Sequence, residues 1–302
     1  MDQAEGLRTL VRTMPAGFPE GETRRSPLVI SVGSGKGGVG KTNVVANLAY
    51  AFTLLGKKTL VFDADLGLAN IDVLLGLAPR YNIRHLLDGQ KTVFEILAAG
   101  PGGMMVLPES SGVLELVDLD ETQKIFLLNE LDALAGTVDI LLIDTAAGIS
   151  SNVLYFNLAA EDTIVVVTPE PTSITDAYAL IKVLAKKYRK ERFSILINSA
   201  QGAQEAKEAF RKISLAVDRF LGSLSIDYLG YIPYDEKLPM AVKTQKPVME
   251  MFPQAASSRG FMEIARNLIS KSAPRKTTGQ VQFFWQHLFQ SQPFTQAEGR
   301  GD

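Results

Sequence analysis

The stretch 32-VGSGKGGVGKT-42 decides the fold of this chain, because it contains a complete phosphate-binding loop. Residues 35–42 fit the pattern G-x-x-x-x-G-K-[ST], after the apolar run 28-LVISV-32 and before the helical pattern 41-KTNVVANLAYAF-52. In this context glycines let backbone N–H groups converge on phosphate oxygens, Lys41 neutralises the β/γ charge, and the Thr42 hydroxyl binds Mg²⁺. The alternative is a glycine-rich turn with an accidental lysine. The expected nucleotide contacts are Gly35, Lys36, Gly37, Gly38, Val39, Gly40, Lys41 and Thr42.

Short apolar runs alternate with helical patterns along the chain. Most of these runs are apolar on both faces, which is typical of strands buried in a parallel sheet. The segments between them show helical periodicity, as in 173-SITDAYALIKVLAKKY-188. We therefore expect one α/β domain over residues 28–271, with a doubly wound, mostly parallel sheet and helices on both faces, as in P-loop NTPases. The predicted strands are 28–32, 59–63, 138–144, 163–168, 193–198 and 226–232.

Polar segments flank this domain on both sides. Residues 1–27 combine a helical pattern with a linker rich in Pro, Gly and charge, and residues 272–302 combine a second linker with one apolar cluster. The first residues mix acids and bases where a signal peptide needs an apolar core, and no apolar run approaches the roughly 18 residues of a membrane span. We expect a cytoplasmic protein whose contact with the inner face of the cell membrane is peripheral.

The composition excludes several classes of function. The 302 residues include no cysteine, which excludes disulfides, thiolate metal sites and iron–sulfur ligation. The two histidines, His85 and His287, fit no metal spacing. The formal net charge of −2 argues against a general nucleic-acid coat, although it is compatible with a local basic patch.

The loop carries a second lysine, Lys36, that phosphate binding does not require. An extra ammonium here either repels Lys41 or serves negative charge that arrives from another direction. The alternative is a solvated surface lysine. The segment GKGGVGKT, with 61-VFDADLGLANIDVLLG-76 and 141-LLIDTAAGI-149, resembles the deviant Walker A ATPases typified by MinD and ParA, over essentially residues 28–270. The resemblance implies an ATP-sandwiched homodimer in which Lys36 crosses to the partner's nucleotide.

Three carboxylates lie at the ends of predicted strands. Asp144 ends a strand beside the loop, where an aspartate typically holds Mg²⁺. Asp63 and Asp65 are two residues apart, so they share a face if the strand stays regular, and together they serve the metal and the attacking water. The resemblance assigns the water to Asp65 and places Asp63 near the metal; the alternative is a pair that caps the following turn. The expected catalytic residues are Asp65, Lys36 and Lys41, and the expected metal-binding residues are Thr42, Asp63 and Asp144.

The choice of base favours adenine. No guanine-reading N/T-K-x-D motif follows the fifth predicted strand. Instead Asn198 ends that strand, where its amide can pair with the adenine edge, and Pro233 follows the sixth. The resemblance assigns both regions to adenine, so the expected cofactors are ATP and Mg²⁺. It also suggests that Asn70 and Asp72 contact the partner across the dimer.

Within the family, the chain resembles the flagellar number regulators called FlhG or FleN. The resemblance rests on 63-DADLGLANIDVLLGLAP-79, 144-DTAAGIS-150, 169-PEPTSITDAYALIK-182 and the start of the chain. A short helix over residues 1–12 that folds onto a partner fits this pattern, and a frayed terminus is the alternative. The D-Q-A-x-x-L-R segment by which such proteins activate the signal-recognition-type GTPase FlhF is matched by Asp2, Gln3, Ala4, Leu7 and Arg8.

An apolar stripe at helical spacing lies near the other end. It resembles the amphipathic helix by which ATP-bound MinD-type dimers hold the membrane. The segment 281–290 carries no Lys or Arg, so its electrostatic attraction to anionic lipid is weak. The alternative is a helix that docks on the protein's own body in the ADP-bound or empty state. The stripe consists of Val281, Phe284, Trp285, Leu288 and Phe289.

The sequence therefore predicts an ATPase switch. ATP closes the dimer around Lys36, and hydrolysis through Asp65 reopens it. The output is control of flagellar number or placement, with the membrane, the FlhF-type GTPase and a flagellar transcription regulator as partners. The alternatives are a cargo- or chromosome-positioning ATPase of the ParA type and an antiactivator that binds ATP without hydrolysing it. Nucleic acid is not expected as a partner.

Overall fold

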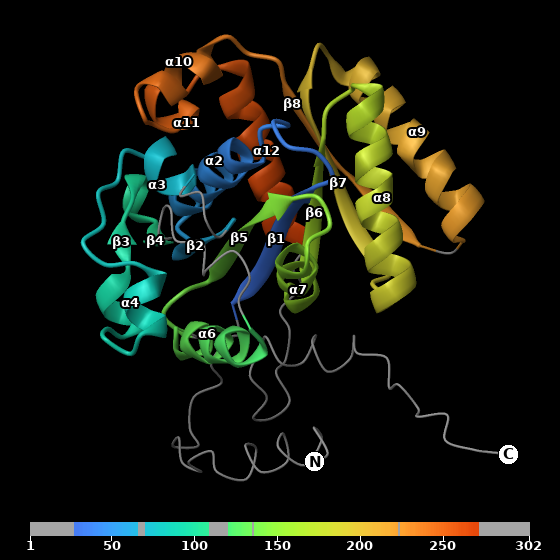
Figure 1. Cartoon of the computed structure of the whole chain (residues 1–302). Coiled ribbons are helices and arrows are strands. Elements are labelled where there is room, and N and C mark those ends of the chain that lie inside the picture. The colour runs from blue at the N-terminus through green and yellow to red at the C-terminus, as the bar shows by residue number, and fades with distance from the viewer. Residues whose placement is uncertain (1–26, 66–69, 109–119, 135, 223, 272–302) are drawn as a thin grey trace, which may run out of the picture.

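A single sheet organises the chain. The structure, a computed structural model, describes residues 27–65, 70–108, 120–134, 136–222 and 224–271. Within these residues eight strands pair in the order β3-β4-β2-β5-β1-β6-β7-β8, and only β3 and β4 pair antiparallel (Figure 1). The strands are β1 Leu28–Ser34, β2 Thr59–Ala64, β3 Ala98–Ala99, β4 Met105–Leu107, β5 Ile140–Ala147, β6 Asp162–Val167, β7 Arg192–Ala200 and β8 Ser225–Pro233.

Helices cover both faces of the sheet. One face packs against α2, α3, α10, α11 and α12, and the other against α4 to α9. The predicted doubly wound, mostly parallel α/β fold is therefore confirmed. The helices are α2 Lys41–Leu54, α3 Asn70–Leu74, α4 Ile83–Leu87, α5 Val93–Ile96, η1 Pro101–Gly103, α6 Glu121–Ala133, α7 Ser151–Ala159, α8 Pro171–Tyr188, α9 Ala203–Leu221, α10 Lys237–Lys243, α11 Val248–Met251 and α12 Ala256–Lys271.

The central strands are buried on both faces, as their apolar composition predicts. In β1, Ile30 belongs to the core under α2, whereas its neighbour Val29 belongs to the core on the opposite face. On that opposite face the rings of Phe62 and Phe156 meet edge to face, with centroids 5.2 Å apart. Such aromatic pairs add about 0.5–1.5 kcal/mol to the burial of their area. The packing ties α7 to β2 beneath the functional edge of the sheet.

The strand order sets the position of the candidate site. β1 lies between β5 and β6, and β2 lies on the other side of β5. In this register Asp144 of β5 is paired with Val32 of β1 and with Asp63 of β2. The phosphate-binding loop and both carboxylates therefore meet toward the carboxyl edge of three adjacent strands, where ligands bind in open α/β sheets, although β5 continues past Asp144 to Ala147.

Several predictions concern residues that the structure does not describe. The partner-binding residues Asp2 to Arg8 and the apolar stripe in 281–290 lie outside the described residues. The division into 1–27, 28–271 and 272–302 therefore stays a prediction, although the described elements run from β1 to the end of α12. In the described part of the chain, none of the helices has the length and apolar character needed to cross a membrane.

Candidate nucleotide-binding site

The phosphate-binding loop joins β1 to α2 as its motif predicts. Gly40 precedes α2 with φ of 84°, and Gly38 has φ of 78°, so both adopt a conformation that favours glycine. Gly35 is required for another reason, because a Cβ there would collide with the main-chain carbonyl of Asp176 in α8. At Gly37 and Gly38 an added Cβ would meet no atom within 4 Å. The loop is therefore braced by α8 at Gly35 and faces open space at Gly37 and Gly38.

Lys41 and Asp144 form a buried ion pair. Lys41 Nζ donates to Asp144 Oδ1 at 2.6 Å, and the two side chains are only 7% and 0% exposed. Burial raises the pKa of Asp144, while the Lys41 ammonium and the Thr42 hydroxyl lower it and the nearby Asp65 carboxylate raises it further. The lysine expected to bind phosphate is thus paired with the carboxylate that is expected to bind metal.

The residues present fit a bound Mg²⁺. Oδ2 of Asp144 is buried and has no hydrogen-bond partner. An unpaired buried carboxylate oxygen is costly unless a ligand uses it. Thr42 is the first residue of α2 after Lys41, and carboxylate and hydroxyl oxygens are ligands of the type that Mg²⁺ prefers. Thr42 and Asp144 are therefore the residues that would hold the ion.

Asp63 caps the turn and the helix that follow β2, the role predicted from the sequence as the alternative to metal binding. Its carboxylate is fully buried and accepts backbone N–H groups of Asp65 at 3.2 Å, Asn70 at 3.0 Å and Ile71 at 3.0 Å. The first oxygen holds the turn after β2, and the second caps the start of α3. The metal-binding role of Asp63 stays a prediction, and these contacts show the capping role instead.

Asp65 and α3 form the next part of the site. β2 ends at Ala64, so the regular strand on which the shared-face argument depended stops before Asp65. Asn70 Nδ2 donates to Asp65 Oδ2 at 3.2 Å, which fixes the half-buried carboxylate from α3. Asp72 turns inward and is 6% exposed, so in this single chain it does not present the surface expected for a contact across a dimer. The exposed residue of α3 is Val73, at 63%.

Lys36 contacts α8 of its own chain. Its Nζ donates to Glu170 Oε2 at 3.1 Å and to Thr172 Oγ1 at 3.2 Å. The side chains of Lys36 and Glu170 are 40% and 62% exposed. Lys36 therefore points away from the buried pair of Lys41, in a contact that solvent or a partner can compete for.

The two residues expected near adenine take different positions. Asn198 Nδ2 donates to the main-chain carbonyl of Val39, at 2.8 Å, and the side chain is 9% exposed. It lies against Gly40, where an added Cβ would come 2.5 Å from Nδ2. Pro233 ends β8 opposite Ala200 and is half-buried. Asn198 thus holds the phosphate-binding loop, and the adenine roles of both residues stay predictions.

Sequence reasoning missed the residues that hold the predicted ones in place. Glu170 and Thr172 lie in a stretch that was singled out only for its resemblance to flagellar regulators. Glu170 and Thr172 are 134 and 136 residues from Lys36 in the chain, so no local sequence pattern predicts their contact with it. Pro171 at the first position of α8 is the one local signal, since it marks the helix start that exposes Glu170 to the loop.

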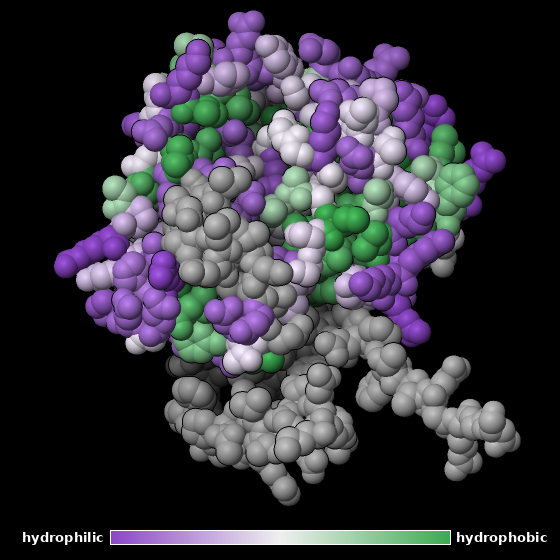
Figure 2. All heavy atoms as spheres, viewed as in Figure 1, coloured by the Kyte–Doolittle hydropathy of each residue, from purple (hydrophilic) through white to green (hydrophobic). Residues whose placement is uncertain are grey.

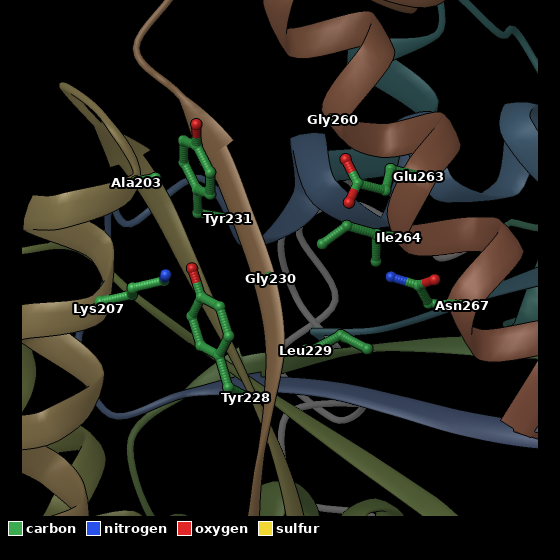
Figure 3. A pocket seen from close by; sticks show the side chains of 10 residues that line it. All are labelled: Ala203, Lys207, Tyr228, Leu229, Gly230, Tyr231, Gly260, Glu263, Ile264 and Asn267. Atoms are coloured by element: carbon green, nitrogen blue, oxygen red, sulfur yellow. The ribbon is translucent and has the colours of Figure 1, made fainter.

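A separate cavity lies at the edge of the sheet. Its volume is about 140 Å³, and it is bounded by α9, β8 and α12. Figure 3 shows Lys207 reaching toward β8 from α9, and Glu263 and Asn267 approaching from α12. None of the predicted site residues lines this cavity, so it is distinct from the phosphate-binding loop.

Comparison with known proteins agrees with this geometry. Residues 26–269 match the ParA family, described as "NUBPL iron-transfer P-loop NTPase". The antiactivator FleN of Pseudomonas aeruginosa is 43% identical over 87% of this chain and 93% of that protein. The flagellum site-determining protein YlxH of Helicobacter pylori is 34% identical over 80% of this chain and 82% of that protein. The MinD cell division protein of Aquifex aeolicus is 29% identical, with a TM-score of 0.66 over 82% of this chain and 99% of that one.

The similarity covers the same part of the chain as the sheet and the loop. The words "iron-transfer" do not carry over, because the chain has no cysteine to ligate iron and sulfur. The matched residues 26–269 include the phosphate-binding loop and the mostly parallel sheet. The chain therefore belongs to the ParA family of P-loop NTPases, alongside MinD, FleN and YlxH.

Proposed function

We propose that this chain is an ATP-dependent switch that forms a homodimer around ATP, hydrolyses it and controls the number or placement of flagella. The observation that carries the proposal is the contrast between the two loop lysines. Lys41 is buried against Asp144, whereas Lys36 is half exposed against Glu170. One lysine is built into the chain's own phosphate site, and the other is available to a second molecule.

Lys41 and Asp144 supply the first step. Lys41 would exchange its carboxylate partner for the phosphates, which would leave Asp144 and Thr42 as the residues that could hold Mg²⁺. Bound Mg²⁺ supplies positive charge that neutralises the phosphate oxygens during transfer. The open side of the loop at Gly37 and Gly38 admits the phosphates to the backbone N–H groups.

Asp65 is the residue proposed to orient the attacking water. Asn70 holds one carboxylate oxygen by a hydrogen bond, and the backbone N–H of Asp65 is itself fixed by Asp63. The carboxylate therefore has a defined direction before any nucleotide binds, which reduces the entropy cost of reaching a productive geometry. Slow turnover is expected until a partner completes the site.

Exposed apolar side chains support a dimer surface at this edge. Val73 in α3 is 63% exposed, and Ile149, just after β5, is 53% exposed. Both follow the strands that carry the candidate site carboxylates. Burying such a side chain contributes roughly 1.5–3 kcal/mol. Figure 2 shows hydrophobic patches among a largely hydrophilic surface, and the apolar groups at this edge are suited to a second copy of the chain.

The biological output is proposed from the relatives. FleN is named an antiactivator and YlxH a flagellum site-determining protein, and both match four fifths or more of this chain. We extend the proposal to a flagellar transcription regulator, to an FlhF-type GTPase bound through residues 2–8, and to the membrane through the stripe in 281–290. These last two contacts rest on the sequence patterns alone.

The solution mass of the protein tests the dimer. Asp65→Ala, which is expected to retain ATP, should be a dimer with Mg·ATP and a monomer with Mg·ADP. Adding Lys36→Ala to it should weaken that dimer, whereas adding Lys182→Ala, which removes an exposed lysine of α8, should not. A monomer in both nucleotide states, or an equal effect of the two lysine variants, would contradict the proposal.

One second candidate is favoured by a specific observation. FleN is named an antiactivator, and the second candidate is an antiactivator that binds ATP without hydrolysing it. In a strain that carries Asp65→Ala, an antiactivator keeps normal flagellar number, whereas an ATPase switch does not. A ParA-type positioning ATPase would instead show ATP-stimulated, salt-sensitive binding to nonspecific DNA.

A further inference from the structure

Gln245 adopts a backbone conformation that is unfavourable for its type. It lies in the turn between α10 and α11 with φ of 56°. Residues other than glycine seldom adopt positive φ, and where they do the surrounding structure must hold them there. The Gln245 side chain supplies such a hold, because Nε2 donates to the main-chain carbonyl of Val73 at 2.8 Å.

This contact fixes the end of α3. The helix finishes with Gly76 in a left-handed conformation, at φ of 62°, and Leu77 N–H bonds back to the Asp72 carbonyl at 2.8 Å. A Cβ added at Gly76 would lie 3.2 Å from the Cβ of Gln245. The two turns are therefore packed tightly against each other, 169 positions apart in the chain.

The start of α3 is tied to the candidate catalytic carboxylate. Asp63 caps the helix through the backbone N–H groups of Asn70 and Ile71, and Asn70 Nδ2 donates to Asp65 Oδ2. α3 has only five residues, so its start and its end lie roughly one turn apart. Hydrogen bonds thus hold α3 at both ends, to Gln245 at its end and to Asp63 and Asp65 at its start.

The turn that carries Gln245 is itself anchored to the phosphate-binding helix. Met249 N–H donates to Asn47 Oδ1 of α2 at 3.3 Å, and Val248 and Met249 are buried in the core beneath α2. The Gln245 amide therefore links a rigid part of the phosphate site with α3. Its partner on α3 is a main-chain carbonyl, so only a donor at this position can make the contact.

We propose that Gln245 is a positioning residue for Asp65. By holding the end of α3, it keeps Asn70 where its amide fixes the Asp65 carboxylate in the direction needed to orient water. This inference rests on the proposed ATP hydrolysis for its kinetic consequence. Its structural consequence, that Gln245 holds α3 in the nucleotide-free chain, is independent of that function.

Gln245→Glu tests the proposal, because it keeps the size of the side chain and removes the donor. The expected result is a kcat for ATP lower by roughly 3- to 10-fold, the loss that one hydrogen bond implies, with the affinity for ATP changed by less than about 2-fold. Hydrogen exchange at the amides of α3 should speed up by a similar factor without nucleotide. Gln245→Gly, which also relieves the backbone, should show the same loss. Gln254→Glu, at an exposed site, is the matched control.

Each outcome decides the matter. If wild type and variants alike show no turnover, the proposed ATPase function fails, and the exchange of α3 amides still tests the role of Gln245. If wild type turns over ATP and Gln245→Glu matches it in kcat or in exchange, the inference is overturned. If Gln245→Glu lowers kcat but also lowers the ATP affinity by a similar factor and lowers the melting temperature, Gln245 has only a structural role, and the inference is overturned.

Discussion

Glu170→Gln should tighten the ATP-dependent dimer. In the single chain Glu170 holds Lys36 at 3.1 Å, and the proposed dimer requires Lys36 to leave that carboxylate for the partner's nucleotide. Glutamine keeps the size of the side chain and removes the charge. The monomer then loses an attraction that the dimer does not use, so the balance shifts toward the dimer.

The expected size follows from the exposure of the pair. The Lys36 and Glu170 side chains are 40% and 62% exposed, so water and salt screen their attraction. An exposed ion pair contributes about 0.2–1 kcal/mol. A symmetric dimer breaks two such pairs, so the dimer gains about 0.4–2 kcal/mol when both are removed, which is roughly a 2- to 30-fold lower Kd.

Sedimentation equilibrium of Asp65→Ala with Mg·ATP measures this change, with and without Glu170→Gln. The difference should shrink in high salt, which screens exposed charges. Glu208→Gln is the matched control, because it removes an exposed ion pair with Arg211 on α9, away from the loop. An unchanged or weaker dimer at low salt would refute the reasoning, and so would an equal gain in the control.

Three further outcomes follow from the described contacts. Lys41→Met should lower the free energy of unfolding of the nucleotide-free protein by about 3 kcal/mol, because Asp144 stays buried without its cation; in urea unfolding Lys41→Met/Asp144→Asn should recover most of the loss. Burial raises the pKa of the Asp72 carboxyl to about 6, above its ordinary 3.8. The folded state therefore binds a proton at Asp72 more readily than the unfolded state, so the free energy of unfolding falls as pH rises from about 4 to 6. Asp72→Asn should remove this fall and be about 2 kcal/mol more stable than wild type at pH 7.5 after allowance for screening, and equal urea midpoints at pH 4 and 7.5 in wild type would contradict the assignment. Gly35→Ala should cost about 1–3 kcal/mol, because its methyl group meets the Asp176 carbonyl, while Gly37→Ala meets open space; equal melting temperatures of the two variants would show that α8 yields freely.

The features that the sequence predicted are those with a local cause. The strands buried on both faces carry mostly apolar runs, and the phosphate-binding loop is a contiguous motif between a strand and a helix. The short strands β3 and β4 were not predicted because they have two and three residues, too few to show a period. The position of Asp144 beside the loop followed from the same logic of parallel strands, although the strand does not end there as predicted, because β5 continues to Ala147.

The contacts that the sequence did not predict join distant parts of the chain. Asn198 reaches Val39 across 159 positions, and its amide holds the loop at the site where pairing with a base was expected. Asp63 and Asp65 do not share a face of the strand, for a local reason that the spacing of the two residues does not reveal. β2 ends at Ala64, so Asp63 turns into the body to cap α3, and Asp65 is left at the rim. Side-chain capping competes with a strand's regular alternation wherever the strand ends.

The two loop lysines are expected to differ in what can displace their ion pairs, because their surroundings differ. Lys41 is almost completely buried with Asp144, so salt in solution screens that pair weakly and only a ligand inside the loop competes for it. Lys36 shares an exposed pair with Glu170, which salt weakens and a second molecule can displace. In the proposed switch, ATP binding is therefore expected to depend little on ionic strength through the Lys41 pair. Dimerisation should carry the salt dependence, and a titration of each step against salt would separate the two lysines without any substitution.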